Sequence, residues 1–383
     1  MFFNIGHQPL ENYPCHWHMG SFCVSTDQGW TTTTVGTAQI LYKGYADQAP
    51  LENLLEQILF QTEPKLTGNF CALVLVDDAI EIQTDLYRSF PMYVGNGVNN
   101  LVPKSQTIWT DSLVTVHSDL SVTEIKFDVI GNIDVSLLTP DQVQQRIIEI
   151  LDQKAQQLVA NTSYPIKVFL SGGVDSLLVY SFLKKHTNNF ELVRGLHLDW
   201  DYFWLKNSSD ITKNWGYTQI HHWTDHCVLT SGAPGDEFML RSPVTSDLFL
   251  KYHNQSIAEL LTQLQWQNCL HYSYFMRPKH QDIFATQQLT STSEQQLHRD
   301  LCNIIVNDWQ HWHLGRTLTW TPLRDLEIFK LMLRLPAASA VDQILNSKLS
   351  IDIIEHNSPG LSQVISPQKN ANNYLSNLTN LVC

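Results

Sequence analysis

Apolar and polar residues along this chain follow first a period of two and later a helical period. Residues 68–76 form an apolar run that ends at the acidic pair Asp77–Asp78, and residues 80–85 then alternate. An apolar strand, a polar turn and an alternating strand predict a β-hairpin. Residues 51–60 carry apolar side chains at helical spacing. We therefore expect a β-rich first part with one or two helices.

The pattern changes near residue 139. Thr139 is a residue type that caps helix N-termini, and Pro140 suits the first helical turn because the N–H that it lacks would be unpaired there. Residues 143–158 then repeat apolar side chains at helical spacing. Because single cores rarely grow beyond about 250–300 residues, we predict two domains, over residues 1–135 and 136–383.

Strands and helices alternate in the second part. We predict a strand over 164–170, a helix over 177–185, and strands over 191–198 and 227–230. This order is typical of a parallel sheet covered by helices. Further helices are predicted over residues 257–264, 297–309, 325–335 and 342–354. The predicted fold class is thus α/β and α+β, with a β-rich domain preceding a parallel-sheet domain.

Composition narrows the class of protein. Hydrophobic residues make up 43% and charged residues 16% of the chain, as in folded globular proteins. The net charge of −13 argues against general binding of nucleic acid or anionic membranes. The seven cysteines form no Cys-x-x-Cys pair, and the sequence has neither a signal-peptide layout nor a membrane-spanning apolar run. These features predict a cytoplasmic protein without a disulfide framework.

Residues 171–176, Ser-Gly-Gly-Val-Asp-Ser, join the predicted strand 164–170 to the helix that follows. In α/β sheets a loop of this kind binds anions, because the first N–H groups of the helix are unpaired and carry partial positive charge. A plain turn before a helix is the alternative interpretation. The match of the whole segment, in this context, favours a phosphate-binding loop.

Individual residues of the loop suit this chemistry. Gly172 and Gly173 let backbone amides approach phosphate oxygens, because no Cβ stands in the way. Ser171 and Ser176 add hydroxyl donors. Asp175 is suited to hold Mg²⁺, which screens the charge of a triphosphate.

The loop lacks the Gly-Lys-Ser/Thr sequence of kinases and GTPases. Ser-Gly-Gly-x-Asp-Ser instead resembles the PP-loop of ATP pyrophosphatases. That group adenylates carbonyl, carboxylate or amide oxygens and releases pyrophosphate. We therefore expect this chain to bind ATP and to cleave it between the α- and β-phosphates.

A second motif, Ser-Gly-Ala-Pro-Gly-Asp-Glu at 231–237, resembles the Ser-Gly-x-Gly-x-Asp-Glu segment of the class B asparagine synthetase superfamily. Residues 321–325, Thr-Pro-Leu-Arg-Asp, are similar to its Val-Pro-Phe-x-Asp. Residues 66–73 and 84–93 look like its Gly-x-Phe-Ala strand and its Arg-Asp-x-x-Gly-x-x-Pro-Leu-Tyr segment. The resemblance covers nearly the whole chain. It implies an Ntn-hydrolase-like sandwich followed by a PP-loop synthetase domain.

The same resemblance implies roles for single residues. Asp175 and Asp236 would carry Mg²⁺, and Lys369 would neutralise charge that builds up on the phosphates or on the tetrahedral intermediate. Lys348 falls in the order of the family's late lysines. An exposed lysine without a catalytic role is the alternative at both lysine positions. Glu237 would serve the structure or act as a base. The positions that contact adenine in the family correspond to Leu170, His197 and Gly232.

Two positions depart from the family. Residue 2 is Phe, whereas a working glutaminase needs Cys there as its N-terminal nucleophile. We therefore expect no glutaminase activity, as in the β-lactam synthetases and lasso-peptide cyclases. Ala233 stands where relatives have an acidic or tyrosyl side chain, and alanine cannot act as a general base. Adenylation is thus better supported than the amine step.

Together these features predict an AMP-forming amide ligase that uses ATP and Mg²⁺. It would adenylate a small-molecule or peptide carboxylate and couple it to an amine, as in lasso-peptide or β-lactam biosynthesis. We expect no nucleic-acid or membrane partner; a homodimer is one expected assembly, and the sequence leaves the oligomeric state open. The alternatives are a scaffold or binding protein with reduced catalysis, and a PP-loop enzyme that modifies nucleobases.

Overall fold

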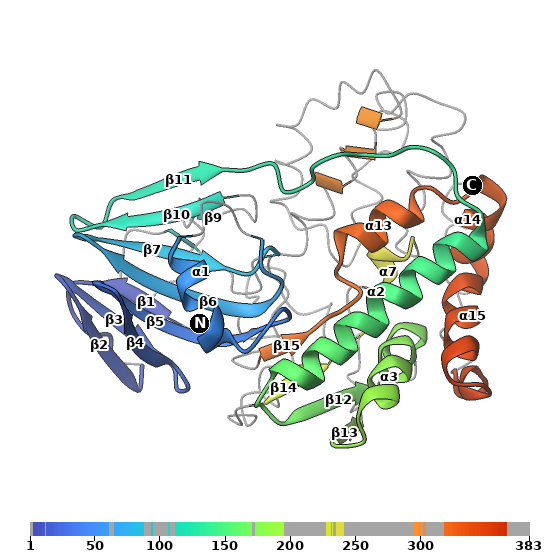
Figure 1. Cartoon of the computed structure of the whole chain (residues 1–383), viewed down its shortest axis with the longest axis horizontal. Coiled ribbons are helices and arrows are strands. Elements are labelled where there is room, and N and C mark those ends of the chain that lie inside the picture. Colours follow the sequence, from blue (N-terminus) through green and yellow to red (C-terminus); the bar gives the residue numbers. More distant parts are fainter. Residues whose placement is uncertain are drawn as a thin grey trace, which may run out of the picture.

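The computed structural model describes residues 3–11, 13–60, 65–87, 93–94, 106–107, 112–170, 173–194, 227–230, 232, 235–240, 295–296, 298–299, 302–303 and 318–365. It has antiparallel sheets in the first part of the chain and a parallel sheet in the second. The mixed α/β content predicted from the sequence is therefore confirmed. Figure 1 shows the antiparallel strands at one end of the molecule, and the parallel strands with their covering helices toward the other.

The first part of the chain contains a three-stranded and a six-stranded antiparallel sheet. The smaller sheet has the order β1 (Phe3–Gly6), β3 (Phe22–Thr26), β2 (Cys15–Met19). The larger sheet has the order β11 (Val122–Lys126), β10 (Ser112–His117), β7 (Ala79–Thr84), β6 (Gly68–Val76), β5 (Ala38–Ala46), β4 (Thr31–Val35). A separate short pair consists of β8 (Tyr93–Val94) and β9 (Gln106–Thr107).

The predicted hairpin and the predicted early helix are both present. β6 and β7 pair in antiparallel register from Cys71↔Thr84 to Val76↔Ala79. Asp77 turns the chain with φ 50, a conformation that aspartate tolerates better than most residues. The apolar stripe at 51–60 forms the 3₁₀ helix η1 (Leu51–Leu54) and the helix α1 (Leu55–Leu59).

Helix α2 (Pro140–Asn161) begins where its capping signals predict. The Thr139 side chain accepts a hydrogen bond from the backbone N–H of Gln142, and the Gln142 side chain accepts one from the N–H of Thr139. This capping box pairs two groups that the helix leaves open. The buried stripe of α2 packs into a core cluster that includes residues from both parts of the chain.

The parallel sheet has the order β13 (Glu191–Arg194), β12 (Ile166–Leu170), β14 (Val228–Thr230), β15 (Leu318–Trp320). Helix α3 (Val174–His186) follows β12 and packs beside α2. The parallel arrangement of β12, β13 and β14 agrees with the prediction, and β15 is a strand that sequence patterns missed. The second half of the strand predicted at 191–198 lies outside the described residues.

The prediction of one helix over 342–354 is wrong. The structure has α14 (Ala337–Asn346) and α15 (Lys348–Asn357), separated by Ser347 in the left-handed conformation with φ 53. The Gln343 side chain explains the break: it donates to Ser350 Oγ and to the Met239 carbonyl and accepts from Ser350 N–H. These bonds stabilise a turn between the two helices in place of a continuous one.

The remaining elements are α7 (Gly235–Phe238), α13 (Leu326–Met332) and η3 (Leu361–Val364). They pack on the helices of the second part of the chain, α13 on α2 and α7, and η3 on α3 and α15. α13 lies within the segment predicted as a helix over 325–335, with Asp325 as its N-cap. The helix predicted at 257–264 and most of the one at 297–309 lie outside the described residues.

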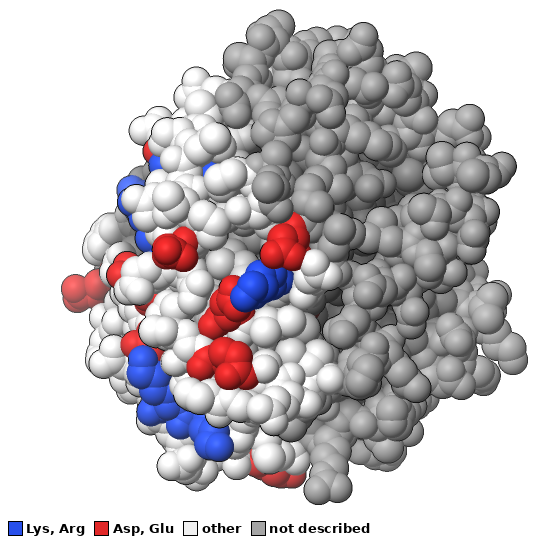
Figure 2. Space-filling view, turned by 90° about the vertical axis from the view of Figure 1, so that its right-hand side faces the viewer, with Lys and Arg blue, Asp and Glu red and all other residues white. Residues whose placement is uncertain are grey.

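The surface of the second part carries mixed charges. Figure 2 views the end of the molecule near α14 and α15, where acidic and basic side chains lie next to one another. The ion pair of Lys348 with Asp352 on α15 is one such arrangement. Within the part of the chain that the structure describes, no helix is both long enough and apolar enough to cross a membrane.

Candidate functional site

A crevice for a ligand is expected where the connections of the parallel sheet diverge. β12 lies between β13 and β14, and the chain passes from β12 through α3 to β13 on one side, while β14 lies on the other. In open α/β sheets such a switch point, at the carboxyl ends of the strands, is where ligands bind. The loop at 171–176 starts at this position, directly after Leu170.

The two motifs meet at this edge through glycine. A Cβ on Gly232 would lie 2.4 Å from the carbonyl carbon of Asp175 and 2.4 Å from the backbone nitrogen of Ser176. A Cβ on Gly235 would lie 2.4 Å from Cγ of Asp175. A Cβ does not approach backbone so closely, so only glycine fits at position 232 without a shift of the backbone. At position 235 the Asp175 and Leu323 side chains would have to move. The fold therefore brings Gly232 and Gly235, which follow β14, against Asp175.

The start of α3 is arranged as in an anion-binding helix. Its N-cap, Gly173, supplies no capping side chain, and the first helical hydrogen bond runs from Leu177 N–H to the Gly173 carbonyl (3.2 Å). In helices generally, the N–H groups of the first turn have no partner within the helix and can bind an anion. The Ser176 hydroxyl donates to the Gly173 carbonyl at 2.9 Å. In this structure it therefore stabilises the turn, and its predicted contact with phosphate stays a prediction.

Oxygen atoms suited to Mg²⁺ and nucleotide lie at the same edge. Asp175 Oδ1 is buried, and so is Thr230 Oγ1 at the end of β14, which has no hydrogen-bond partner in the described part of the chain. The described residues contain no group of three or more His, Cys, Asp or Glu side chains arranged for a metal. Mg²⁺ usually takes one or two protein carboxylates and completes its shell with phosphate and water oxygens. Asp175 with one further carboxylate therefore fits this ion.

The structure describes some of the other predicted site residues and not the rest. Leu170 is the half-buried last residue of β12. Lys348 is the first residue of α15; its side chain is 57% exposed and pairs with Asp352. This is the arrangement of a solvated helix position, the alternative already noted for Lys348. Asp236 and Glu237 belong to α7, but their side chains are outside the description. Ser171, Gly172, His197 and Lys369 lie outside the described residues.

A buried polar cluster supports the site from the first part of the chain. Leu323 Cδ1 would be 2.7 Å from a Cβ on Gly235, so Leu323 packs directly on the glycine that contacts Asp175. Arg324 is buried and donates to the Tyr87 carbonyl, and its guanidinium lies over the Tyr87 ring. The Tyr87 hydroxyl accepts from Leu326 N–H at 2.9 Å.

The next residue, Asp325, is also held by several interactions. Its carboxylate caps α13 by accepting from two backbone N–H groups, at 2.7 and 3.2 Å. Its second oxygen lies 3.0 Å from Lys154 Nζ on α2. Sequence reasoning did not identify Lys154 or Tyr87, because nothing in the local sequence around them indicates their distant partners.

Burial and charge shift the titration of this cluster. Burial lowers the pKa of Arg324 to about 10, against the opposing effect of Asp85, so the guanidinium is still charged at neutral pH. Burial also acts to lower the pKa of Lys154, but the carboxylates of Asp325 and Asp47 outweigh it and raise that pKa. Burial raises the pKa of Tyr87 well above its ordinary value, so its hydroxyl is neutral.

Comparison with known proteins does not assign the chain to a family. None of the protein-family models scanned matches the chain, and a search of curated proteins finds no similar sequence.

Proposed function

We propose that this protein is an ATP-dependent amide ligase that releases AMP and pyrophosphate. The observation that carries the proposal is the approach of Gly232 and Gly235 to Asp175 at the switch point of the parallel sheet. Two motifs far apart in sequence, each resembling an adenylating enzyme, share one site. Residues 1–135 would form the Ntn-hydrolase-like domain and residues 136–383 the PP-loop synthetase domain.

In the proposed reaction, the loop at 171–176 and the N-terminus of α3 hold the phosphates of ATP. Mg²⁺, held by Asp175 and Asp236, would neutralise charge on the β- and γ-phosphates. An oxygen of the substrate carboxylate attacks the α-phosphorus, and the bond to the bridging oxygen breaks to release pyrophosphate. The amine then attacks the carbonyl carbon of the acyl-adenylate, loses a proton, and expels AMP.

The residues that act on charge differ between the two steps. Lys369 would stabilise negative charge on the phosphates or on the tetrahedral intermediate. Glu237 would hold the local structure or accept a proton from the amine. Because residue 2 is Phe and residue 233 is Ala, we expect the amine to come from a substrate and not from glutamine hydrolysis.

The test is a measurement of AMP and pyrophosphate release over a panel of carboxylates and amines. Asp175→Ala should reduce turnover by at least about 100-fold, the loss seen when a group that stabilises transition-state charge is removed. The matched control is Asp141→Ala, which removes an exposed aspartate from the first turn of another helix, α2. Products of ADP and phosphate, or equal activity of the two variants, would overturn the proposal.

A further inference from the structure

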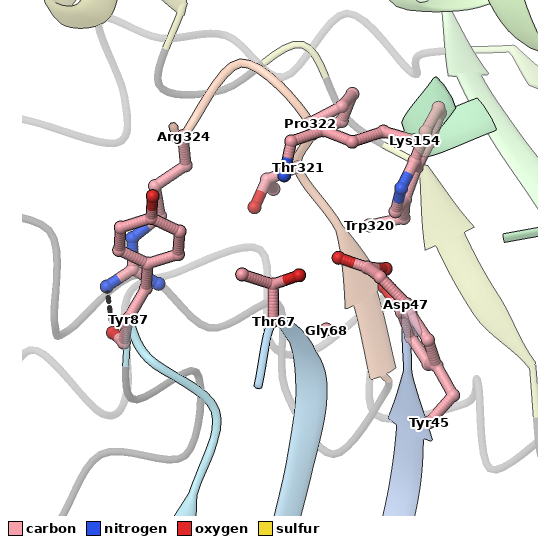
Figure 3. A pocket seen from close by; sticks show the side chains of 10 residues that line it. All are labelled: Tyr45, Asp47, Thr67, Gly68, Tyr87, Lys154, Trp320, Thr321, Pro322 and Arg324. Carbon is pink, nitrogen blue, oxygen red and sulfur yellow. Dashed lines mark hydrogen bonds between the residues drawn. The ribbon is translucent and has the colours of Figure 1, made fainter. Parts of the chain in front are cut away.

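A small cavity lies between the two parts of the chain, among the residues of the buried polar cluster. It is found where β5 ends and β6 begins, beside the segment that follows β15 (Figure 3). Its volume is about 20 Å³, which is enough for a group of the size of a water molecule. The proposed adenylation chemistry uses none of its lining side chains.

Asp47 is the feature of this cavity that calls for a ligand. The residue is 4% exposed, and its Oδ1 atom is buried without a hydrogen-bond partner in the described part of the chain. In Figure 3 its carboxylate points into the cavity. The backbone is fixed on both sides, since Asp47 N–H donates to the Thr67 carbonyl and Asn161 donates to the Asp47 carbonyl. A buried carboxylate in a fixed place is unfavourable unless it accepts hydrogen bonds or pairs with a cation.

The charges around the cavity favour a cation. Three buried carboxylates, Asp47, Asp85 and Asp325, face two basic groups, Lys154 and Arg324. Lys154 makes its ion pair with Asp325 at 3.0 Å and acts on Asp47 only from further away. Arg324 donates to a backbone carbonyl, and the charge of Asp85 acts to raise its pKa against the effect of burial. Of these three carboxylates, Asp47 is the one that has a buried oxygen without a hydrogen-bond partner among the described residues.

The walls of the cavity favour an ammonium group over a metal ion. Tyr45, Tyr87 and Trp320 line it, and aromatic rings attract organic cations and ammonium groups through cation–π interactions. Both phenol groups are already engaged with the backbone: Tyr45 donates to the Thr319 carbonyl, and Tyr87 accepts from Leu326 N–H. The ligand therefore meets neutral rings and one carboxylate.

We propose that this cavity binds a small ammonium group, either the ammonium ion or the –NH₃⁺ head of a primary amine, with the Asp47 carboxylate as its partner. The N–H groups of the ligand donate hydrogen bonds to the Asp47 carboxylate. The positive charge of the ligand balances the excess of carboxylates around the cavity. This proposal does not depend on the ATP chemistry and would hold for a protein that binds no nucleotide.

Thermal unfolding of the full chain tests it, at constant ionic strength in five chloride salts: ammonium, methylammonium, potassium, sodium and tetramethylammonium. Because a ligand that binds only the folded state stabilises it, we expect ammonium and methylammonium to raise Tm by about 2–4 °C over sodium. Potassium and tetramethylammonium should give no comparable rise. The first has no N–H groups, and the second is too large for the cavity.

Asp47→Asn should abolish the rise, and in sodium it should be at least as stable as the wild type because a buried charge is gone. The matched control is Asp134→Asn, which removes an exposed carboxylate paired with Arg334; it should keep the full rise. Calorimetric titration of methylammonium well below Tm should show one site per chain, lost in Asp47→Asn.

Each other outcome overturns the proposal. An equal rise in potassium would make the ligand a monovalent metal ion, and an equal rise in Asp47→Asn would place the cation elsewhere. No rise in the wild type would mean that the cavity holds water only. If Asp47→Asn does not fold, the order of the wild-type Tm values in the five salts decides between these outcomes.

Discussion

The switch point and the polar cluster between the two parts of the chain differ in the residue types that form their contacts. At the switch point, Gly232 lies against the backbone of Asp175 and Ser176, and Gly235 lies against the Asp175 side chain. In the cluster, long charged side chains, Lys154 and Arg324, connect elements distant in sequence. The two regions touch through Leu323, which packs on Gly235. The first region provides the proposed chemistry, and the second fixes the segment that closes it from one side.

This comparison predicts that the polar cluster contributes more to the free energy of unfolding than the switch point does. Lys154→Met should destabilise the fold by about 3–5 kcal/mol, because it leaves Asp325 as a buried carboxylate without its ion-pair partner. Urea unfolding measures the loss. Lys330→Met on α13 removes a lysine whose partner, Glu327, is 65% exposed, and should cost less than about 1 kcal/mol. Equal losses would contradict the difference between the two pairs.

Position 232 at the switch point should tolerate no side chain. Gly232→Ala places a Cβ 2.4 Å from the Asp175 backbone, so we expect a loss of about 1–3 kcal/mol in stability and of nearly all ATP turnover. Gly6→Ala is the control, because a Cβ there meets its nearest atom at 3.7 Å. A Gly232→Ala protein with normal turnover would show that the two motifs do not share one site.

A milder change tests whether the regions are coupled. Arg324→Lys keeps the charge but loses the planar contact with Tyr87, so the 321–325 segment should hold Gly235 less firmly. We expect KM for Mg²⁺-ATP to rise by about two- to tenfold with a smaller change in kcat.

Arg334→Lys is the matched control for this change. Arg334 also bonds to backbone, through its contact with the Ser136 carbonyl at 2.7 Å, but it lies at the far end of α13. An equal rise of KM in both variants would indicate general loosening of the fold and not coupling through Leu323.

The smallest effect near neutral pH concerns the buried phenols. Burial raises the pKa of Tyr45 and Tyr87 well above 10, so the unfolded chain releases their protons first and stability falls as pH rises above about 10. The raised pKa of Lys154 acts in the same direction, and the lowered pKa of Arg324 partly opposes it. Tyr87→Phe should make the decline shallower by up to about 1.4 kcal/mol per pH unit. An unchanged slope in pH-dependent urea unfolding would argue against a buried neutral Tyr87.

Local signals were sufficient for much of the fold. The N-cap at Thr139 and the β6–β7 hairpin each depend on residues within a few positions, and both were predicted from the sequence. The three-residue strand β15 is too short for a pattern to reveal. Ser347 breaks the predicted helix because Gln343 bonds to Met239, a contact that no local pattern contains.

The same limit applies to the candidate site. The loop at 171–176 and the motif at 231–237 are contiguous, so each could be recognised from residue types alone. Tyr87 and Arg324 are separated by 237 positions, and their hydrogen bond depends on how the two parts of the chain pack. Asp47 likewise gains its significance only from the cavity that forms around it.

The most direct test of the proposed adenylation follows the carboxylate oxygen. A carboxylate substrate that supports turnover is labelled with ¹⁸O, and the AMP product is analysed by mass spectrometry. Attack of the carboxylate on the α-phosphorus predicts AMP that carries one ¹⁸O atom, in the wild type and in Asp141→Ala alike. AMP without label, or label found only in inorganic phosphate, would contradict the account.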